Sequence, residues 1–373
     1  MEFICRTCGN KYDDSFKGWR CECGGSLWLN REVEFKREDI RQNDFTQWRY
    51  DKAYPIKKEE LISTFGEGMT PLVKDTWENI DIYIKNDALM PTGSFKDRGV
   101  AMMINYLALK GVKKITEDSS GNAGASVAEY AAKAGIECSI YVPEGTSEGK
   151  IGQVISSGAM IHQIPGPREE TARAAQSDIE GVYASHNWNP YFIEGVKSIA
   201  YELWEQFNFS APDNIIVPTG NGSLPLALEQ GFQELLKNGE VKHLPKIYGI
   251  QTQNCNPIYR KFHGLSEVFD AEPTVGEGIA LKFSSHIDEV IKAIQVSKGN
   301  VLEVTEEEIL QALRNICKKG YFIEPTSATA FAGASKLIKD GIINSSETTV
   351  IVISGNGLKA SNKILKYINM NKD

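Results

Sequence analysis

Two kinds of apolar pattern alternate along most of the chain. Short runs of β-branched and other apolar residues predict buried strands, and segments with apolar residues every three to four positions predict amphipathic helices. Such alternation is typical of parallel sheets with helices on both faces, so we expect an α/β fold with two doubly wound parallel-sheet lobes. The predicted strands are residues 80–87, 113–120, 137–145, 159–166, 182–187, 214–222, 246–253 and 348–357, and the predicted helices are 95–111, 121–135, 168–181, 190–207 and 223–239.

Two helix starts carry a capping-box motif. Thr305 and Glu308 have the required spacing and precede a helical apolar pattern. Ser94 and Asp97 form the S-x-x-D version of the same motif. This predicts a helix that begins at Ser94 and has Lys96 in its first turn.

Lys96 is the residue whose position suggests chemistry. A cation in the first turn of a helix faces the positive end of the helix dipole, and burial would favour the neutral amine further. A neutral lysine is a nucleophile that forms a Schiff base with a carbonyl compound, and pyridoxal phosphate is the commonest such partner. The alternative is a surface lysine that pairs with Asp97.

Three turns that follow predicted strands are rich in Gly, Asn and Ser. They lie at residues 119–126, 218–225 and 354–360. Backbone N–H groups at such turns, next to a helix N-terminus, can bind a phosphate or a carboxylate. Each turn could also be only a tight connection. The sequence contains no G-x-x-x-x-G-K-[ST] motif, which excludes a P-loop nucleotide hydrolase.

Four of the seven cysteines lie between residues 5 and 23. Cys5 and Cys8 form one pair, and Cys21 and Cys23 form a tighter C-x-C pair. Two glycine-bearing turns of this kind can bring four thiolates to the corners of a tetrahedron, so we expect a structural zinc site or an empty relic of one, with unrelated free cysteines as the alternative. Residues 1–32 would then be a zinc-ribbon-like segment and residues 33–373 a catalytic region.

Composition narrows the choice of partners and location. The chain has 373 residues, of which 41% are hydrophobic and 24% charged, with a net charge of -8. A sequence pI near 5.4 argues against nucleic acid or an anionic membrane as a partner. The chain lacks an apolar run of membrane-spanning length and a signal peptide, so we expect a cytoplasmic protein.

Seven segments together resemble one enzyme family. They are GEGMTPL, PTGSFKDRG, SSGNAGAS, NPYFIEGVKSIAYELWEQ, PTGNGSLPLA, EPTSATAFAG and SGNGLK. With these segments, the sequence over residues 63–362 is similar to threonine synthases and their relatives among the tryptophan-synthase-β-like, or fold type II, pyridoxal-phosphate enzymes. The resemblance implies a cofactor-dependent carbon-oxygen lyase, a smaller lobe at roughly residues 97–205, and a homodimer.

The resemblance also implies a role for individual residues. Lys96 would bond the cofactor and carry protons, Asn122 would bind the cofactor's 3-hydroxyl, and Ser354 would face its pyridine nitrogen. Backbone amides of Gly220, Asn221, Gly222, Ser223 and Leu224 would bind the cofactor phosphate. The substrate would be bound by Ser119, Ser120, Gly121, Ala123, Gly124, Glu277 and Lys359.

The implied reaction converts O-phospho-L-homoserine and water to L-threonine and phosphate. Threonine synthases usually carry an Ala-Ile-Arg run where this chain has Ile279-Ala280 and no arginine. The surrounding sequence GEGIA is more similar to serine and threonine dehydratases. An alternative is therefore β-elimination or β-replacement on serine, threonine, phosphoserine or diaminopropionate. Lys359 could instead be a solvated lysine, and a non-catalytic cofactor-binding protein is disfavoured by the presence of Lys96.

Overall fold

The computed structural model describes residues 1–16, 18–146 and 148–369. The chain divides into two compact units. The first unit comprises Met1–Gly68 and Lys96–Ser198, and the second comprises Met69–Phe95 and Ile199–Asp373. The first unit therefore contains the cysteine segment as well as most of the predicted smaller lobe. Within the described residues, no helix has both the length and the apolar character needed to cross a membrane.

The first unit contains two sheets. A small antiparallel sheet has the strand order β2-β1-β3, and a parallel sheet has the order β8-β7-β6-β9. Its elements are β1 (Glu2–Cys5), β2 (Lys11–Asp13), β3 (Leu27–Leu29), three 3₁₀ turns (Arg37–Asp39, Gln47–Ala53, Lys58–Glu60), α1 (Lys96–Leu109), β6 (Lys114–Glu117), α2 (Asn122–Ala134), β7 (Glu137–Pro143), α3 (Glu148–Ser156), β8 (Met160–Ile164), α4 (Arg168–Ser177), β9 (Val182–Tyr183) and α5 (Pro190–Val196).

The second unit is built on a six-stranded sheet with the order β12-β11-β10-β13-β5-β4. Helix α6 begins at the unit boundary. The elements are β4 (Leu72–Trp77), β5 (Ile80–Asn86), α6 (Ser198–Gln206), β10 (Asn214–Pro218), α7 (Ser223–Lys237), β11 (Lys246–Thr252), α8 (Pro257–Phe262), α9 (Ile287–Val296), β12 (Asn300–Val304), α10 (Glu306–Lys318), α11 (Pro325–Lys339), β13 (Thr349–Ile353), α12 (Ser361–Asn369) and 3₁₀ turns at Asp87–Leu89, Glu277–Ile279 and Gly357–Ala360.

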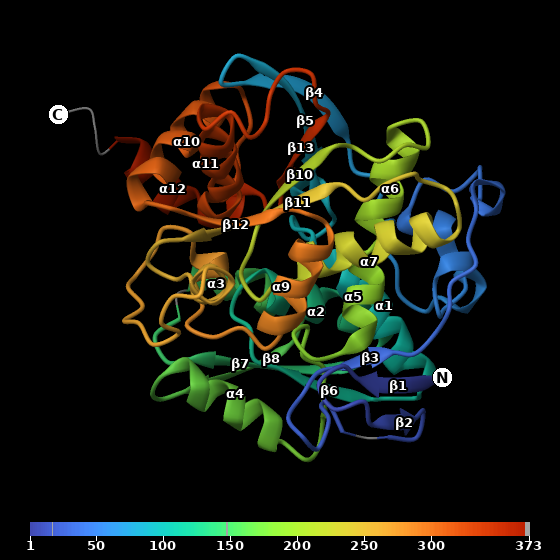
Figure 1. Ribbon diagram of the computed structural model, residues 1–373. Helices are drawn as coiled ribbons and strands as arrows, with labels where there is room; N and C mark the ends of the chain where they lie inside the picture. Colours follow the sequence, from blue (N-terminus) through green and yellow to red (C-terminus); the bar gives the residue numbers. More distant parts are fainter. Residues whose placement is uncertain (17, 147, 370–373) are drawn as a thin grey trace. The chain divides into compact units, whose positions relative to one another are not determined.

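The larger sheet corrects one expectation, because it is mixed rather than parallel. Strand β4 pairs antiparallel with β5, whereas the other neighbours in the sheet run parallel. The central strands β10 and β13 are buried along their whole length. Helices α10 and α11 lie on one side of this sheet, and α7 and α9 lie on the other (Figure 1). A parallel strand buried on both faces must be apolar throughout, which explains the continuous apolar runs in the sequence.

One predicted capping box is confirmed and the other is wrong. The Thr305 side chain accepts a hydrogen bond from the Glu308 backbone N–H, and the Glu308 side chain accepts one from the Thr305 backbone N–H. Helix α1, in contrast, begins at Lys96 and not at Ser94. Ser94 forms an isolated β-bridge with Gly355, and its Oγ has no hydrogen-bond partner among the described residues. A pairing that is distant in sequence has replaced the local cap.

Candidate active site

Lys96 opens helix α1 in the first unit. Its side chain is partly buried, and its Nζ lies 5.3 Å from the ring centroid of Phe192 on α5. Helices α1 and α5 approach each other closely at Gly195. A Cβ on this residue would lie 2.1 Å from the Arg98 carbonyl oxygen, so only glycine allows the approach. Burial is the main cause that lowers the pKa of Lys96 to about 8. A larger fraction of this amine than of an ordinary lysine is therefore neutral near physiological pH, in the direction that the nucleophile prediction requires.

The turn at residues 119–124 joins β6 to α2 in the same unit. Gly121 precedes the helix, and no side chain caps this helix end. A Cβ at Gly124 would lie 1.8 Å from the Ser119 carbonyl oxygen, so only glycine fits this turn. The Asp97 carboxylate, next to Lys96 in the chain, accepts a 2.6 Å hydrogen bond from Ser126 on α2. This bond fixes the first turn of α1 against the first turns of α2.

A buried acid lies beside this turn. Glu117 ends β6, is 0% exposed, and places its Oε1 2.7 Å from Nδ1 of His186. Burial, reinforced by Asp118, raises the pKa of Glu117 well above its ordinary value, although Lys96 opposes the shift. Neither Glu117 nor His186 was predicted as a site residue.

In the second unit, the turn at residues 220–224 leads from β10 into α7. Gly222 has φ +96°, and a Cβ there would lie 2.1 Å from Cγ2 of Val290. No side chain caps α7, so its first N–H groups can bind an anion. The Asn221 carboxamide holds a neighbouring segment, because it accepts a hydrogen bond from the Ser285 backbone N–H at 2.8 Å and donates one to Ser285 Oγ at 2.8 Å.

Ser354 lies at the end of β13 and is buried. Its hydroxyl is 3.0 Å from the hydroxyl of Ser327 on α11. The Ser327 oxygen also accepts hydrogen bonds from the backbone N–H groups of Ser354 and Gly355. Ser327 therefore orients Ser354. It lies in the motif EPTSATAFAG, which the sequence analysis used only for the family resemblance.

The Ser354 loop also holds the segment that ends at Phe95. The Phe95 backbone N–H donates a 3.0 Å hydrogen bond to the Ser354 carbonyl oxygen, and both residues belong to the second unit. The boundary between the two units lies directly after Phe95.

The two predicted substrate residues of the second unit have different surroundings. Glu277 opens a 3₁₀ turn and forms an ion pair with Lys363. The Lys359 side chain lies along the Gly93 turn, since a Cβ at Gly93 would be 3.1 Å from Lys359 Cε. Lys359 is thus held near the loop that precedes Lys96, whereas the carboxylate of Glu277 already has a cationic partner.

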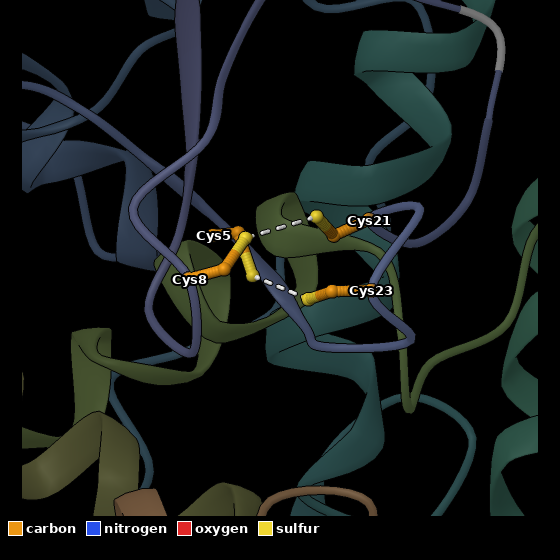
Figure 2. Close-up of side chains that lie close together, drawn as sticks. All are labelled: Cys5, Cys8, Cys21 and Cys23. Carbon is orange, nitrogen blue, oxygen red and sulfur yellow. Dashed lines mark hydrogen bonds between the residues drawn. The ribbon is translucent and has the colours of Figure 1, made fainter.

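The four N-terminal cysteines form one cluster in the first unit (Figure 2). Their Sγ atoms all lie within 4.8 Å of one another, with 3.6 Å between Cys5 and Cys23 and 3.5 Å between Cys8 and Cys21. Sulfur atoms that bind zinc tetrahedrally at about 2.3 Å are about 3.8 Å apart. Burial raises the pKa of Cys21, but hydrogen bonds from Tyr12 and Cys23 outweigh it and lower the pKa to about 6. The cluster could hold a metal ion.

Comparison with known proteins gives a family match. The family model described as "Pyridoxal-phosphate dependent enzyme" matches residues 63–355. A threonine synthase of Methanocaldococcus jannaschii is 33% identical over 374 residues, which cover 95% of this chain and 92% of the relative. A threonine synthase of Halalkalibacterium halodurans is 33% identical, and the match covers 87% of this chain and 94% of the relative.

Solved structures share the fold. A fungal L-serine ammonia-lyase from Rhizomucor miehei has a TM-score of 0.70 at 20% identity, and the match covers 81% of this chain and 98% of that one. A processed threonine deaminase isoform 2 from Solanum lycopersicum has a TM-score of 0.69 at 20% identity, and the match covers 92% of each chain. At this identity the likeness concerns the fold, which is the α/β fold of the fold type II enzymes.

Proposed function

The chain belongs to the pyridoxal-phosphate-dependent enzymes, and on this premise we propose that it converts O-phospho-L-homoserine and water to L-threonine and phosphate. The observation that carries the proposal is the 33% identity to a threonine synthase over 95% of this chain. The similarity covers 92% of that relative as well, and the family model spans the lysine turn and the turns at residues 119–124 and 220–224. Similarity limited to a cofactor-binding core would support only the broader family.

The local structure in each unit fits the cofactor. Lys96 offers an amine whose pKa is lowered to about 8, as a bond to an aldehyde requires. Gly222 leaves room for a backbone turn that any Cβ would block, at the uncapped N-terminus of a 15-residue helix. This is a suitable cradle for a phosphate. When bound, pyridoxal phosphate supplies an aldehyde that bonds amines and a conjugated ring that withdraws electrons.

Each site residue then has a defined task. Lys96 would bond the cofactor, release it to the substrate amine, and accept the α-proton on Nζ. Asn122 would donate to the cofactor's 3-hydroxyl. Ser354, oriented by Ser327, would hydrogen-bond the pyridine nitrogen without forcing its protonation, because a hydroxyl carries no charge.

The remaining groups would bind anions and orient the substrate. Backbone N–H groups of residues 220–224 would hold the cofactor phosphate, and the turn at residues 119–124 would hold the substrate carboxylate. Lys359 would attract the substrate phosphate. We further propose that Cys5, Cys8, Cys21 and Cys23 bind a structural zinc ion. The homodimer and the cytoplasmic location stay predictions.

A second function has one observation in its favour. Residues 277–280 read Glu-Gly-Ile-Ala and contain no arginine, so the run that threonine synthases usually carry there is missing. Such a site suits β-elimination or β-replacement on serine, threonine, phosphoserine or diaminopropionate. The ion pair between Glu277 and Lys363 would then have to open before Glu277 could face a substrate.

Substrate assays separate the two functions. Purified protein with added pyridoxal phosphate is incubated in parallel with O-phospho-L-homoserine, L-serine and L-threonine. We expect equimolar phosphate and threonine from the first substrate and little keto acid from the other two. A keto acid and ammonia from serine, without phosphate release from phosphohomoserine, would instead establish the elimination reaction.

A further inference from the structure

The Glu117 carboxylate is buried with only half of its hydrogen-bonding capacity in use. Its Oε1 lies 2.7 Å from Nδ1 of His186, but its Oε2 has no hydrogen-bond partner among the described residues. The side chain is 0% exposed, and His186 is 9% exposed. Leaving a buried polar atom unpaired is costly, so the position calls for an explanation beyond packing.

This pair lies close to the proposed catalytic lysine. The Phe192 ring is 5.3 Å from Lys96 Nζ and 5.7 Å from the His186 ring, measured to ring centroids. Phe192 therefore contacts the lysine as well as the histidine that holds Glu117. All four residues belong to the first unit, which also contains the turn at residues 119–124. Glu117 is also only two residues before the proposed carboxylate-binding turn in the chain.

The surroundings of the pair bring the proton affinities of Glu117 and Lys96 closer together. Burial raises the pKa of Glu117 well above its ordinary value, and burial lowers the pKa of Lys96 to about 8. Proton transfer becomes easier as the pKa values of the two groups approach each other. The other titratable groups that act on one or both are Asp118 after β6, which accepts a hydrogen bond from Tyr183, Arg168 on α4, Cys138 on β7, Tyr183 on β9 and His186 itself.

We propose that Glu117 and His186 act as a positioning pair that exchanges one proton with Lys96. The ammonium form of Lys96 and the anionic pair convert to the neutral amine and the protonated pair, so that charge and protons balance. The proposal rests on the proposed function, in which Lys96 accepts a proton from the substrate and must lose it again. When the pair is anionic, it stabilises the ammonium form of Lys96. When the pair has taken up the proton, Lys96 is again the neutral nucleophile.

The proton affinity of Lys96 tests this directly. Full-length protein freed of cofactor is labelled with acetic anhydride from about pH 6 to about pH 10, and acetylation of Lys96 is quantified by mass spectrometry. Replacing Glu117 by Gln removes the anion that favours the ammonium form, so the midpoint of labelling should fall by about one pH unit or more.

The matched control is Glu137→Gln, which removes the same charge from an exposed position at the start of β7. This variant should keep the wild-type midpoint. Equal midpoints in wild type and Glu117→Gln would overturn the proposal.

A second measurement needs no variant of Glu117. The chain has only five histidines, so the ring nitrogens of His186 can be followed by ¹⁵N NMR and assigned with His186→Gln. We expect these signals to shift with the same midpoint as the labelling of Lys96. Constant signals across that range would overturn the proposal. Neither experiment needs bound cofactor, so a chain in which borohydride traps no cofactor at Lys96 would refute the proposed function and leave this test intact.

Discussion

The two glycine turns at residues 119–124 and 220–224 share a backbone design but differ in charge. Each joins a parallel strand to the uncapped N-terminus of a helix. The first turn follows Glu117 and Asp118, whereas the second follows Pro218 and Thr219. The hydrogen bonds around Asn221 in the second turn go to serine hydroxyls and a backbone amide, which are neutral.

The difference shows that similar turns serve different chemistry. A neutral turn at a helix N-terminus that no side chain caps suits a phosphate that stays bound throughout the reaction. A turn flanked by carboxylates suits a region where an amine gains and loses protons, because the acids stabilise its charged form. The difference in charge between the two turns comes from the residues just before each turn and not from the glycines.

The largest effect on turnover is expected from removing the Lys96 amine, which belongs to the first unit. Lys96→Ala should lower turnover at least about 10³-fold, because both the bond to the cofactor and the proton carrier are lost. Absorbance spectra before and after borohydride reduction, with mass spectrometry of the peptide, measure the bond. Lys242→Ala, at an exposed lysine, is the control and should behave as wild type. Cofactor trapped in Lys96→Ala at the wild-type yield would show that another lysine performs the reaction.

The next largest effect concerns the neutral turn. Gly222→Ala places a Cβ 2.1 Å from Val290 Cγ2 at φ +96°, so the turn must distort. Backbone strain of this kind costs about 1–3 kcal/mol. We expect weaker cofactor binding by at least about tenfold, since tenfold corresponds to about 1.4 kcal/mol. Fluorescence titration with pyridoxal phosphate and a thermal melt measure both quantities.

A matched glycine separates distortion of the turn from strain alone. Gly239 follows α7, has φ +76°, and would meet no atom within 4 Å if it carried a Cβ. Gly239→Ala should lower stability but leave cofactor affinity unchanged. Adding Val290→Ala to Gly222→Ala should restore part of the affinity. Equal loss of affinity in the two glycine variants would contradict a specific phosphate cradle at residues 220–224.

Local patterns in the sequence predicted most of the scaffold. The predicted strand at residues 214–222 and helix at 223–239 correspond to β10 and α7, because buried strands and amphipathic helices leave strong periodic signals. Strand β4 gave no comparable signal, since it lies at the edge of the sheet, where three of its six residues are exposed and only Trp77 is buried. Its antiparallel pairing was therefore not predicted.

The parts of the site that were missed depend on contacts between distant residues. Glu117 and His186 are 69 residues apart in the chain, and Ser327 and Ser354 are 27 residues apart. No local sequence motif therefore predicts either pair. The Ser94 cap failed for the same reason, because its bridge partner is Gly355. The family resemblance gave roles for Lys96 and the glycine turns but none for the acid that lies beside the lysine.

The smallest effect on turnover is expected at the cysteine cluster, which belongs to the same unit as the charged turn. A four-sulfur zinc site leaves no open position for a substrate, so its loss should act on folding and not on chemistry. Cys23→Ser should lower the metal content from about one ion per chain and lower the melting temperature, while turnover below that temperature changes by less than about twofold. Elemental analysis and a thermal melt measure these outcomes, with Cys317→Ser on α10 as the control. A loss of turnover as large as that of Lys96→Ala would contradict a purely structural role. It would mean that the cysteine cluster supports the turn at residues 119–124 directly.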